Sequence, residues 1–287
     1  MKIRTTVYTA AVLAAVFLGG CRRNFDITAT NAITSLAQIP ATEIRTEAVT
    51  VSDSLINTGN SAKVLVSADC PVSGNFFAVN SIYEWMSEEL GGTFRNPSND
   101  DGKGMMSYYA DLYLQDLREN VLPDMHSDME ASKEIAFSKE YETDKVVSYI
   151  CKGAGYLGGA HGYATYYGQT FRKSDGRRIS YDIFLNDKLQ QLAELVKAGV
   201  EEQYFDTENT LQESLVLDEA EIFPLPTTPP VFMENGILFV YQQYEITAYA
   251  AGMPQCFIPY EQIRPYLTQT GISLLDDNGY VVDSRKK

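Results

Sequence analysis

KEIAFSKEY-ETD-KVVSYICKGAGY, residues 133–156, consists of two alternating, β-branched and aromatic runs on either side of a short polar turn. A third such run follows at 163–172, and Ser174-Asp175-Gly176 then leads into residues 178–181. Alternation with a period of two, broken by turn residues, is typical of neighbouring antiparallel strands. These residues therefore predict a β-meander.

The sequence before this meander predicts a hairpin and two helices. Residues 43–57 and 61–72 alternate around Asn57-Thr58-Gly59-Asn60, the pattern of a hairpin. A helix is expected over 75–90, where Gly91-Gly92 ends it, and a second over 105–122, after a loop at 96–104. The apolar faces of the two helices are expected to consist of Phe77, Ile82, Trp85, Met86 and Leu90, and of Tyr109, Leu112, Tyr113, Leu117 and Val121.

The sequence after the meander returns to helices and then to strands. Helices are expected over 182–204, with Asp182 as the cap, and over 208–219. A second hairpin is expected from 231–234 and 237–246 around Glu234-Asn235-Gly236, followed by a strand at 255–258 and a short helix at 259–267. Strand pairs interrupted by helices, without strict βαβ alternation, predict an α+β fold with antiparallel sheets and packed helices.

The first residues predict an export signal. Met-Lys-Ile-Arg is followed by an apolar run of about a dozen residues, which is shorter than the roughly 20 residues needed to cross a bilayer. The run ends in Leu18-Gly19-Gly20-Cys21, which resembles a bacterial lipobox. We therefore expect cleavage before Cys21, acylation of Cys21 and a lipoprotein facing the periplasm or the cell exterior. An unmodified cysteine after an ordinary signal peptide is the alternative.

These features together predict the domain organisation. Residues 1–20 are expected to be the signal peptide and 21–42 a lipidated tether. Two consecutive α+β domains are expected over 43–157 and 158–270, and residues 271–287 are expected to form a tail.

Composition limits the classes of partner. The 287 residues carry 23 basic and 38 acidic side chains, a net charge of −15. Cleavage would remove Lys2 and Arg4 and leave −17. A chain without a basic patch does not neutralise phosphates, so we expect no nucleic-acid partner. The acidic balance is consistent with simple solubility or with electrostatic steering of a cationic protein.

The remaining thiols allow more than one interpretation. With Cys21 acylated, Cys70, Cys151 and Cys256 are an odd number in a compartment that permits disulfides. One disulfide and one buried thiol, in an undefined pairing, is one interpretation. Three small core residues is the other.

Catalytic and cofactor motifs are mostly missing from the sequence. Only His126 and His161 are present, which excludes H-E-x-x-H and three-histidine zinc sites. The sequence contains no C-x-x-C, G-x-S-x-G or Walker A motif. Residues 153–158 spell G-x-G-x-x-G, but the chain opens another strand afterwards rather than the helix a dinucleotide site requires. We expect no cofactor, no metal ligand set and no assigned catalytic residue.

Two sequence regions are candidates for ligand binding. His161 lies among glycines in Gly158-Gly159-Ala160-His161-Gly162, a shaped connection between strands. It is either a general base near a thiol or carboxylate or a histidine that bonds its own turn. Glu245 and the surrounding aromatics could form a sugar-stacking surface, or these residues could be half-buried strand residues. The candidate ligand-binding residues are His161, Tyr244, Glu245, Tyr249 and Tyr260.

The same motifs carry a family resemblance. It rests on Gly158-Gly159-Ala160-His161, Asp175-Gly176-Arg177-Arg178-Ile179 and Asp182-Ile183-Phe184, and further on 235–239, Tyr-Ala-Ala-Gly at 249–252 and 258–260. The chain resembles a domain-of-unknown-function family similar to the extracellular part of the anti-sigma factor RsiV and the non-catalytic module of the deacetylase PdaC. Residues 44–157 resemble the companion domain that precedes it. The chain departs from these proteins in lacking a sigma-binding segment, a spanning helix and a Thr-Phe-Asp-Asp sequence.

The resemblance implies a binding role, because the corresponding region of the anti-sigma factor binds lysozyme. We therefore expect an envelope lipoprotein that binds lysozyme or a cell-wall glycan, with contacts at 158–162 and 248–255. A hydrolase of envelope polymers that uses His161 and an architectural lipoprotein without catalysis are the alternatives.

Overall fold

The computed structural model describes residues 43–57, 59–95, 101–126, 128–205, 210–217 and 222–275. The predicted signal peptide, Cys21 and the tether to residue 42 lie outside the described residues, as does the predicted tail from residue 276 onward. The described residues belong to one compact unit, Pro40–Lys287. No helix within the described ranges is long and apolar enough to cross a membrane.

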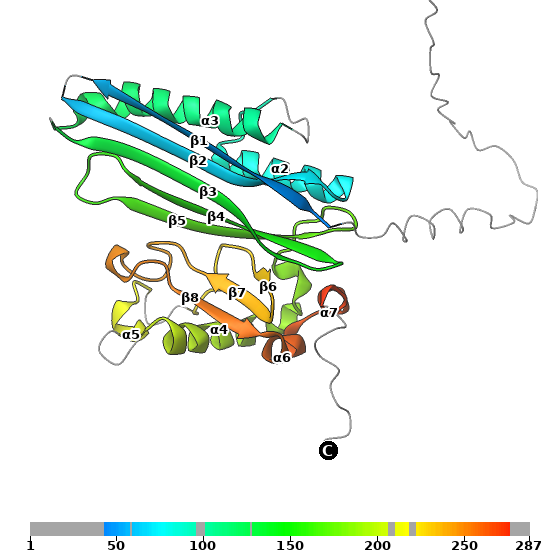
Figure 1. Ribbon diagram of the computed structural model, residues 1–287. Helices are drawn as coiled ribbons and strands as arrows, with labels where there is room; N and C mark the ends of the chain where they lie inside the picture. Colours follow the sequence, from blue (N-terminus) through cyan, green and yellow to red (C-terminus); the bar gives the residue numbers. More distant parts are fainter. Residues whose placement is uncertain are drawn as a thin grey trace, which may run out of the picture. The chain divides into compact units, whose positions relative to one another are not determined.

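The larger sheet has five strands in the order β1-β2-β3-β4-β5 (Figure 1). The strands are β1 (Arg45–Asn57), β2 (Asn60–Ser73), β3 (Glu130–Glu142), β4 (Val146–Tyr156) and β5 (Tyr163–Arg172). The predicted hairpin is confirmed, because β1 and β2 pair antiparallel from Asn57↔Asn60 inward. The meander is confirmed for β3, β4 and β5.

One strand pair differs from the antiparallel expectation. β2 and β3 are parallel, in the register Ser61↔Glu130 to Ala68↔Phe137. The connection between the two strands is the reason. The segment with the two helices crosses back to the end of the sheet where β2 begins, so β3 starts there and runs in the same direction as β2. The predicted strand at 178–181 is wrong, because only the bridge Phe171↔Arg178 forms there.

Helices α2 (Phe76–Leu90) and α3 (Gly102–Asp116) cover one face of this sheet (Figure 1). Asn75 caps α2 by accepting hydrogen bonds from the amides of Phe77 and Ala78, and Gly91 with φ 122° ends it, as predicted. α3 is followed by a π-helical turn, Leu117–Val121, and a 3-10 turn, Leu122–Asp124. Phe77 does not belong to the buried face and is 54% exposed.

The core under α2 is aromatic at its centre. Trp85 contacts Phe137 and Phe171 edge-on, with ring centroids 5.4 and 5.9 Å apart. All three side chains are buried. Aromatic pairs in this geometry add about 0.5–1.5 kcal/mol each beyond the area they bury, so this triad joins helix and sheet.

The smaller sheet has the order β6-β7-β8 and is antiparallel. Its strands are β6 (Val231–Met233), β7 (Gly236–Val240) and β8 (Gln255–Pro259). Its main helix is α4 (Leu189–Gln203), whose residues Leu192, Val196 and Val200 are buried in the second core. The α+β class with mostly antiparallel sheets is confirmed.

Several elements in this half are shorter than the sequence predicts. The 3-10 turns Tyr181–Ile183 and Asn186–Lys188 precede α4, so Asp182 does not cap it and instead accepts a hydrogen bond from Ser180. The second helix is only α5 (Leu211–Ser214). The last helices are α6 (Tyr260–Ile263), the 3-10 turn Arg264–Tyr266 and α7 (Gln269–Leu274), and a 3-10 turn also forms at Tyr249–Ala251.

Strand β7 ends at Val240 although the alternating pattern continues to residue 246. Tyr241 turns into the core and is fully buried, and its hydroxyl donates to the Pro224 carbonyl at 2.7 Å. Tyr244 then adopts φ 67°, which a strand does not allow. The hydrogen bond from the Gln242 amide to Glu245 and the turn at Tyr244 therefore replace further pairing with β8.

The two sheets contact each other where β6 of the smaller sheet lies against β3, β4 and β5 of the larger one. The Phe232 amide donates to Thr170 Oγ1 at 2.9 Å, and Thr170 shares a buried hydrogen bond with Ser148. A Cβ atom on Gly168 would lie 2.2 Å from Val231, so only glycine allows this approach. The predicted domain boundary between residues 157 and 158 falls in the connection between β4 and β5, two neighbouring strands of the larger sheet.

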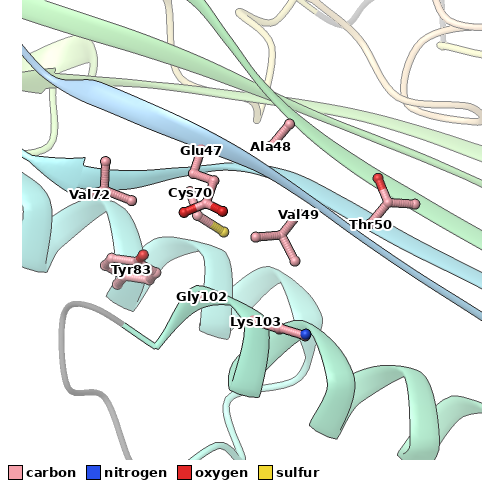
Figure 2. Close-up of a pocket in the computed structure, with 9 residues that line it drawn as sticks. All are labelled: Glu47, Ala48, Val49, Thr50, Cys70, Val72, Tyr83, Gly102 and Lys103. Atoms are coloured by element: carbon pink, nitrogen blue, oxygen red, sulfur yellow. The ribbon is translucent and has the colours of Figure 1, made fainter.

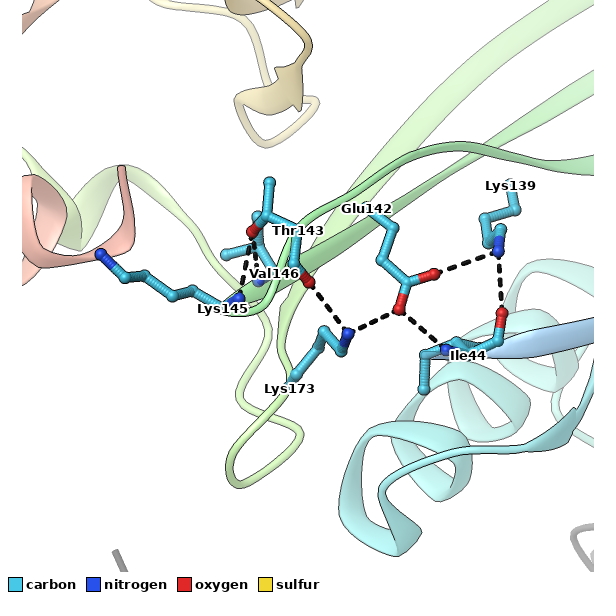
Figure 3. Close-up of polar contacts among 7 residues, drawn as sticks. All are labelled: Ile44, Lys139, Glu142, Thr143, Lys145, Val146 and Lys173. Atoms are coloured by element: carbon cyan, nitrogen blue, oxygen red, sulfur yellow. Dashed lines mark hydrogen bonds and ion pairs between the residues drawn. The ribbon is translucent and has the colours of Figure 1, made fainter. Parts of the chain in front are cut away.

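A polar network fixes the start of β1 (Figure 3). Glu142 Oε1 accepts hydrogen bonds from the Ile44 amide at 2.8 Å and from Lys173 Nζ at 2.6 Å. Lys139 Nζ bonds Glu142 Oε2 at 3.1 Å and the Ile44 carbonyl at 2.8 Å. Lys173 is only 2% exposed and also donates to the Thr143 carbonyl. One carboxylate thus joins the ends of β1, β3 and β5.

Candidate functional site

Three aromatic side chains from distant parts of the chain meet at the surface. The rings of His161 and Tyr249 are stacked, with centroids 3.9 Å apart and planes at 26°. The ring of Tyr244 lies 5.9 Å from that of Tyr249. His161 is exposed, Tyr244 is 61% exposed and Tyr249 is half-buried. We call His161, Tyr244 and Tyr249 the aromatic cluster.

Hydrogen bonds to one carbonyl fix the stacked pair. Tyr249 donates its hydroxyl to the Gly162 carbonyl at 2.8 Å, and His161 Nδ1 lies 2.8 Å from the same oxygen. A carbonyl only accepts, so Nδ1 carries the proton and Nε2 is the acceptor in the neutral ring. A Cβ on Gly162 would lie 2.7 Å from the Gly155 carbonyl oxygen. Glycine at 162 is therefore required for this turn.

The loop that carries Tyr244 and Tyr249 is held on the edge of β5. Gln243 Oε1 accepts from the Ala164 amide at 3.2 Å. Gln242 pairs with Tyr166 in both directions, accepting from its amide at 3.2 Å and donating to its carbonyl at 2.6 Å. The two side-chain amides occupy positions that a sixth strand would fill. Neither glutamine stands out in the sequence, because the strand that their side chains bond lies more than seventy residues away along the chain.

Glu245 has a positioning role in this geometry. Its two carboxylate oxygens accept from the Gln242 amide at 2.7 Å and from the Thr227 amide at 2.6 Å. These bonds close the turn around Tyr244, the residue at φ 67°. A non-glycine residue in this region of φ costs free energy and is held by its surroundings, a feature that gathers at binding sites.

Tyr260 is not brought to the aromatic cluster. It begins α6, is 8% exposed and donates its hydroxyl to the Met233 carbonyl at 2.8 Å. Its ring packs 5.9 Å from that of Phe232. Tyr260 therefore belongs to the core around β6 and β7, and we leave it out of the candidate site.

The three thiols are buried and free. Burial raises the pKa of Cys70 and of Cys256 to about 12, and it raises the pKa of Cys151 as well. The thiolate is the nucleophilic form, so these pKa values keep the thiols unreactive at neutral pH. The interpretation as small core residues is confirmed. No thiol is placed to act with His161, and the carboxylate of Glu245 is already engaged by two amides.

A cavity of about 400 Å³ opens between β1, β2 and the helices (Figure 2). Cys70, Tyr83 and Gly102 lie in its depth, and Glu47 and Lys103 are also in its lining. A Cβ on Gly102 would lie 2.4 Å from Cys70 Sγ, so α3 starts in close contact with the strand. Its only thiol is the protonated Cys70, which offers no nucleophile at neutral pH.

Comparison with known proteins finds one family model that matches part of the chain. Residues 181–261 match the family model described as protein of unknown function, DUF3298. Tyr244, Glu245, Tyr249 and Tyr260 lie inside this match, whereas His161 precedes it. No curated protein matches the sequence. The likeness to the RsiV and PdaC modules is not named by these matches and stays a prediction.

Two crystal structures share the fold. A DUF3298 family member from Bacteroides fragilis superposes with a TM-score of 0.66 at 18% identity, covering 81% of this chain and 97% of its own. A DUF3298 family protein from Pseudomonas aeruginosa gives a TM-score of 0.51 at 14% identity, covering 78% and 95%. At these identities the similarity establishes the fold alone.

Proposed function

We propose that this chain, which carries a DUF3298 domain at 181–261, is a lipid-anchored envelope protein that binds a cell-wall glycan through the aromatic cluster. The observation that supports the proposal most is the exposed, pre-stacked pair of His161 and Tyr249 beside Tyr244. Flat aromatic faces with polar edges suit pyranose rings, which present an apolar face and a rim of hydroxyls. The lipid at Cys21 would hold the protein close to this polymer.

Preorganisation supports binding rather than turnover. The cluster is fixed before any ligand arrives, by the Gly162 carbonyl, by the glutamine contacts to β5 and by Glu245. A rigid binding surface avoids the entropy cost of ordering side chains. In contrast, a hydrolase needs a nucleophile or a base–acid pair within reach of the substrate, and the described residues around His161 supply neither.

The net charge favours a second candidate ligand, a cationic protein such as lysozyme. A molecule with a charge of −15 attracts a basic partner over several ångströms and raises its association rate. This mode predicts that affinity falls steeply as salt rises. Glycan stacking predicts little dependence on salt, so the two ligands separate in one titration series.

The test uses residues 40–287, which form one compact unit. Soluble peptidoglycan fragments and lysozyme are titrated separately, by calorimetry, at low and moderate salt. Tyr244→Asn removes a ring while keeping a residue that tolerates positive φ, and His161→Ala removes the stacking partner. Tyr108→Ala on α3 is the matched control, because Tyr108 is also exposed, at 39%.

Glycan affinity is expected to fall about tenfold or more in both cluster variants, equivalent to about 1.4 kcal/mol, and to stay unchanged in the control. Equal affinity of the wild type and both cluster variants for the fragments would overturn the glycan proposal. Binding of lysozyme that disappears at moderate salt would support the second candidate. Absence of binding to both ligands would contradict both candidate functions.

A further inference from the structure

Three large apolar side chains are exposed within six residues of chain. Val72 at the end of β2 is 51% exposed, and Phe76 and Phe77 in the first turn of α2 are 64% and 54% exposed. The two phenylalanine rings lie 5.7 Å apart. We call Val72, Phe76 and Phe77 the apolar patch. Large apolar side chains that gather on a surface are typical of sites that contact another protein or a membrane.

The exposure follows from how α2 is fixed. Asn75 Oδ1 accepts from the Phe77 amide at 2.9 Å and from the Ala78 amide at 3.4 Å, which sets the start of the helix. Ile82 and Met86 are fully buried and set its rotation. The two phenylalanines consequently lie off the buried face, and no adjustment of the first turn returns both to the core.

The segment of chain that carries the patch is uncharged, although Arg45 and Glu47 lie beside it on β1. No residue from Cys70 to Tyr83 is charged, although the whole chain carries a net charge of −15. Exposed aromatic side chains on an uncharged segment suit the interface of a bilayer, where aromatic side chains concentrate.

The patch lies beside the point where the described chain begins. A Cβ on Gly74 would lie 2.3 Å from Ile44 Cδ1, so the residues between β2 and α2 touch the residue before β1. Figure 1 shows β1 and α2 starting at the same end of the sheet. Between Cys21 and Glu43 are only 21 residues, so the predicted acylation site is close in sequence to this end of the sheet.

From these observations we infer that the apolar patch docks on the surface of the lipid bilayer, an inference that rests on the lipid anchor at Cys21 in the proposed function. Two phenylalanines alone bind a membrane weakly and reversibly. The anchor makes their contact intramolecular, at an effective concentration in the millimolar range for a short flexible link. The anchor and the patch together would fix one end of the larger sheet against the membrane.

The test uses the mature lipidated protein in vesicles of phosphatidylethanolamine and phosphatidylglycerol that contain brominated acyl chains. Phe76→Trp places a fluorophore in the patch. Ile56→Trp is the matched control, because Ile56 is 89% exposed and lies near the other end of β1, about 40 Å away. Wild type supplies the background, since its single tryptophan, Trp85, is buried.

Bromine is expected to quench the Phe76→Trp signal at least twofold more than the Ile56→Trp signal. The double variant Phe76→Ser/Phe77→Ser should still float with vesicles, yet lose the protection from deuterium exchange that vesicles confer on the first turn of α2. Equal quenching of both tryptophans in a protein that floats would overturn docking and leave the anchor standing. Patch-dependent dimers in sedimentation, without preferential quenching, would assign the patch to a second copy and also overturn docking.

Flotation of the Cys21→Ser chain tests the anchor itself. If the serine chain floats as well as the cysteine chain, the lipid is not what holds the protein, and docking by this mechanism is wrong. Ligand binding is measured in solution on residues 40–287, so failure of the glycan proposal and failure of docking are separate results.

Discussion

Glu142 shows how one side chain can hold three strand ends together. Its carboxylate accepts hydrogen bonds from the ammonium groups of Lys139 and Lys173 and from the amide of Ile44. Lys173 is 2% exposed, and the Glu142 carboxylate is its ion-pair partner. Removing one member of a buried ion pair leaves an uncompensated charge, which costs more than the pair itself contributes.

We expect Glu142→Gln to lower the free energy of unfolding by about 3 kcal/mol, since the variant leaves the Lys173 ammonium buried without its anion. Chemical denaturation of residues 40–287 measures the change. Glu140→Gln, an exposed site on the same strand, is the control and should change stability by no more than about 0.5 kcal/mol. Equal effects of the two substitutions would contradict the role given to Glu142.

The three thiols give a second prediction at this scale. Cys70, Cys151 and Cys256 are buried and free, and the pKa of each is raised by burial. Native protein at pH 8 should therefore show no thiol that reacts with a disulfide reagent, and the unfolded chain of residues 40–287 should show three. One reactive thiol after unfolding would reveal a disulfide between the other two.

The same pKa shifts predict an alkaline limit to stability. Folding raises the pKa of Cys70 and Cys256 from 9.0 to about 12, so the folded state favours the protonated thiols. Their contribution is complete below pH 9 and is lost as the pH rises toward 12. The urea midpoint should fall between pH 8 and pH 10.5, and Cys256→Ala should reduce the fall. A midpoint that rises over this interval would contradict the prediction.

At the scale of elements, β5 is an edge strand closed by side chains. Gln242 and Gln243 bond Ala164 and Tyr166 where another strand would otherwise pair. An open edge is a template for aggregation, and natural sheets cover it. Here the cover is also the loop that positions Tyr244 and Tyr249, so protection of the edge and assembly of the aromatic cluster depend on the same contacts.

Gln242→Ala should therefore loosen the aromatic cluster without unfolding the sheet. The Tyr166 amide loses its acceptor, and its hydrogen exchange is expected to accelerate by about tenfold or more. Glycan affinity should fall in parallel. Gln255→Ala, at an exposed position on β8, is the control. Unchanged exchange at Tyr166 would show that the loop is held by other contacts.

Local pattern predicted most of these elements. The hairpin turn at 57–60, the cap at Gly91 and the three strands of the meander follow from short-range chemistry. The parallel pairing of β2 with β3 does not, because it depends on how two helices return the chain. The early end of β7 at Val240 goes with the turn that Glu245 closes through the amides of Gln242 and Thr227. Both departures are tertiary effects that no window of sequence contains.

The candidate site was predictable in residue type more than in geometry. The glycines around His161 and the tyrosines near 244–249 were recognisable as surface candidates from the sequence. His161 and Tyr249 are 88 residues apart in the sequence, and they meet only because the loop lies along β5. Two adjacent glutamines hold the loop there, and nothing in the local sequence pattern marks them. Tyr260 has the same residue type but lies in the core.

At the scale of the whole molecule, the described residues contain two hydrophobic cores that meet where β6 packs against β3, β4 and β5. The first core gathers around Trp85 and Phe137 and the second around Phe239 and Tyr241. β5 and β6 connect them where Gly168 faces Val231 and Thr170 bonds Phe232. A junction this close couples the stability of the two cores.

Gly168→Ala should strain that junction, because its Cβ would lie 2.2 Å from Val231. We expect a loss of about 1–3 kcal/mol, the usual range for overpacking, and separation of the single thermal transition into two in calorimetry. Gly159→Ala is the control, since the added Cβ meets nothing closer than 3.9 Å. One unaltered transition in Gly168→Ala would show that the cores are not coupled there.

The parallel pair β2–β3 has a consequence for the order in which the chain can fold during synthesis. Ser61 and Glu130 are neighbours in the sheet although 69 positions separate them. The β1–β2 hairpin can close as soon as its residues have been synthesised, yet the edge of β2 that pairs with β3 stays open until α2, α3 and β3 have followed. During that interval the hairpin is an unpaired template, and at common rates of synthesis, about 5–20 residues per second, it lasts several seconds. A chaperone that shields strand edges would act on this protein in that window, and α2, the helix that directly follows the hairpin, sets how soon the hairpin acquires a core to pack on.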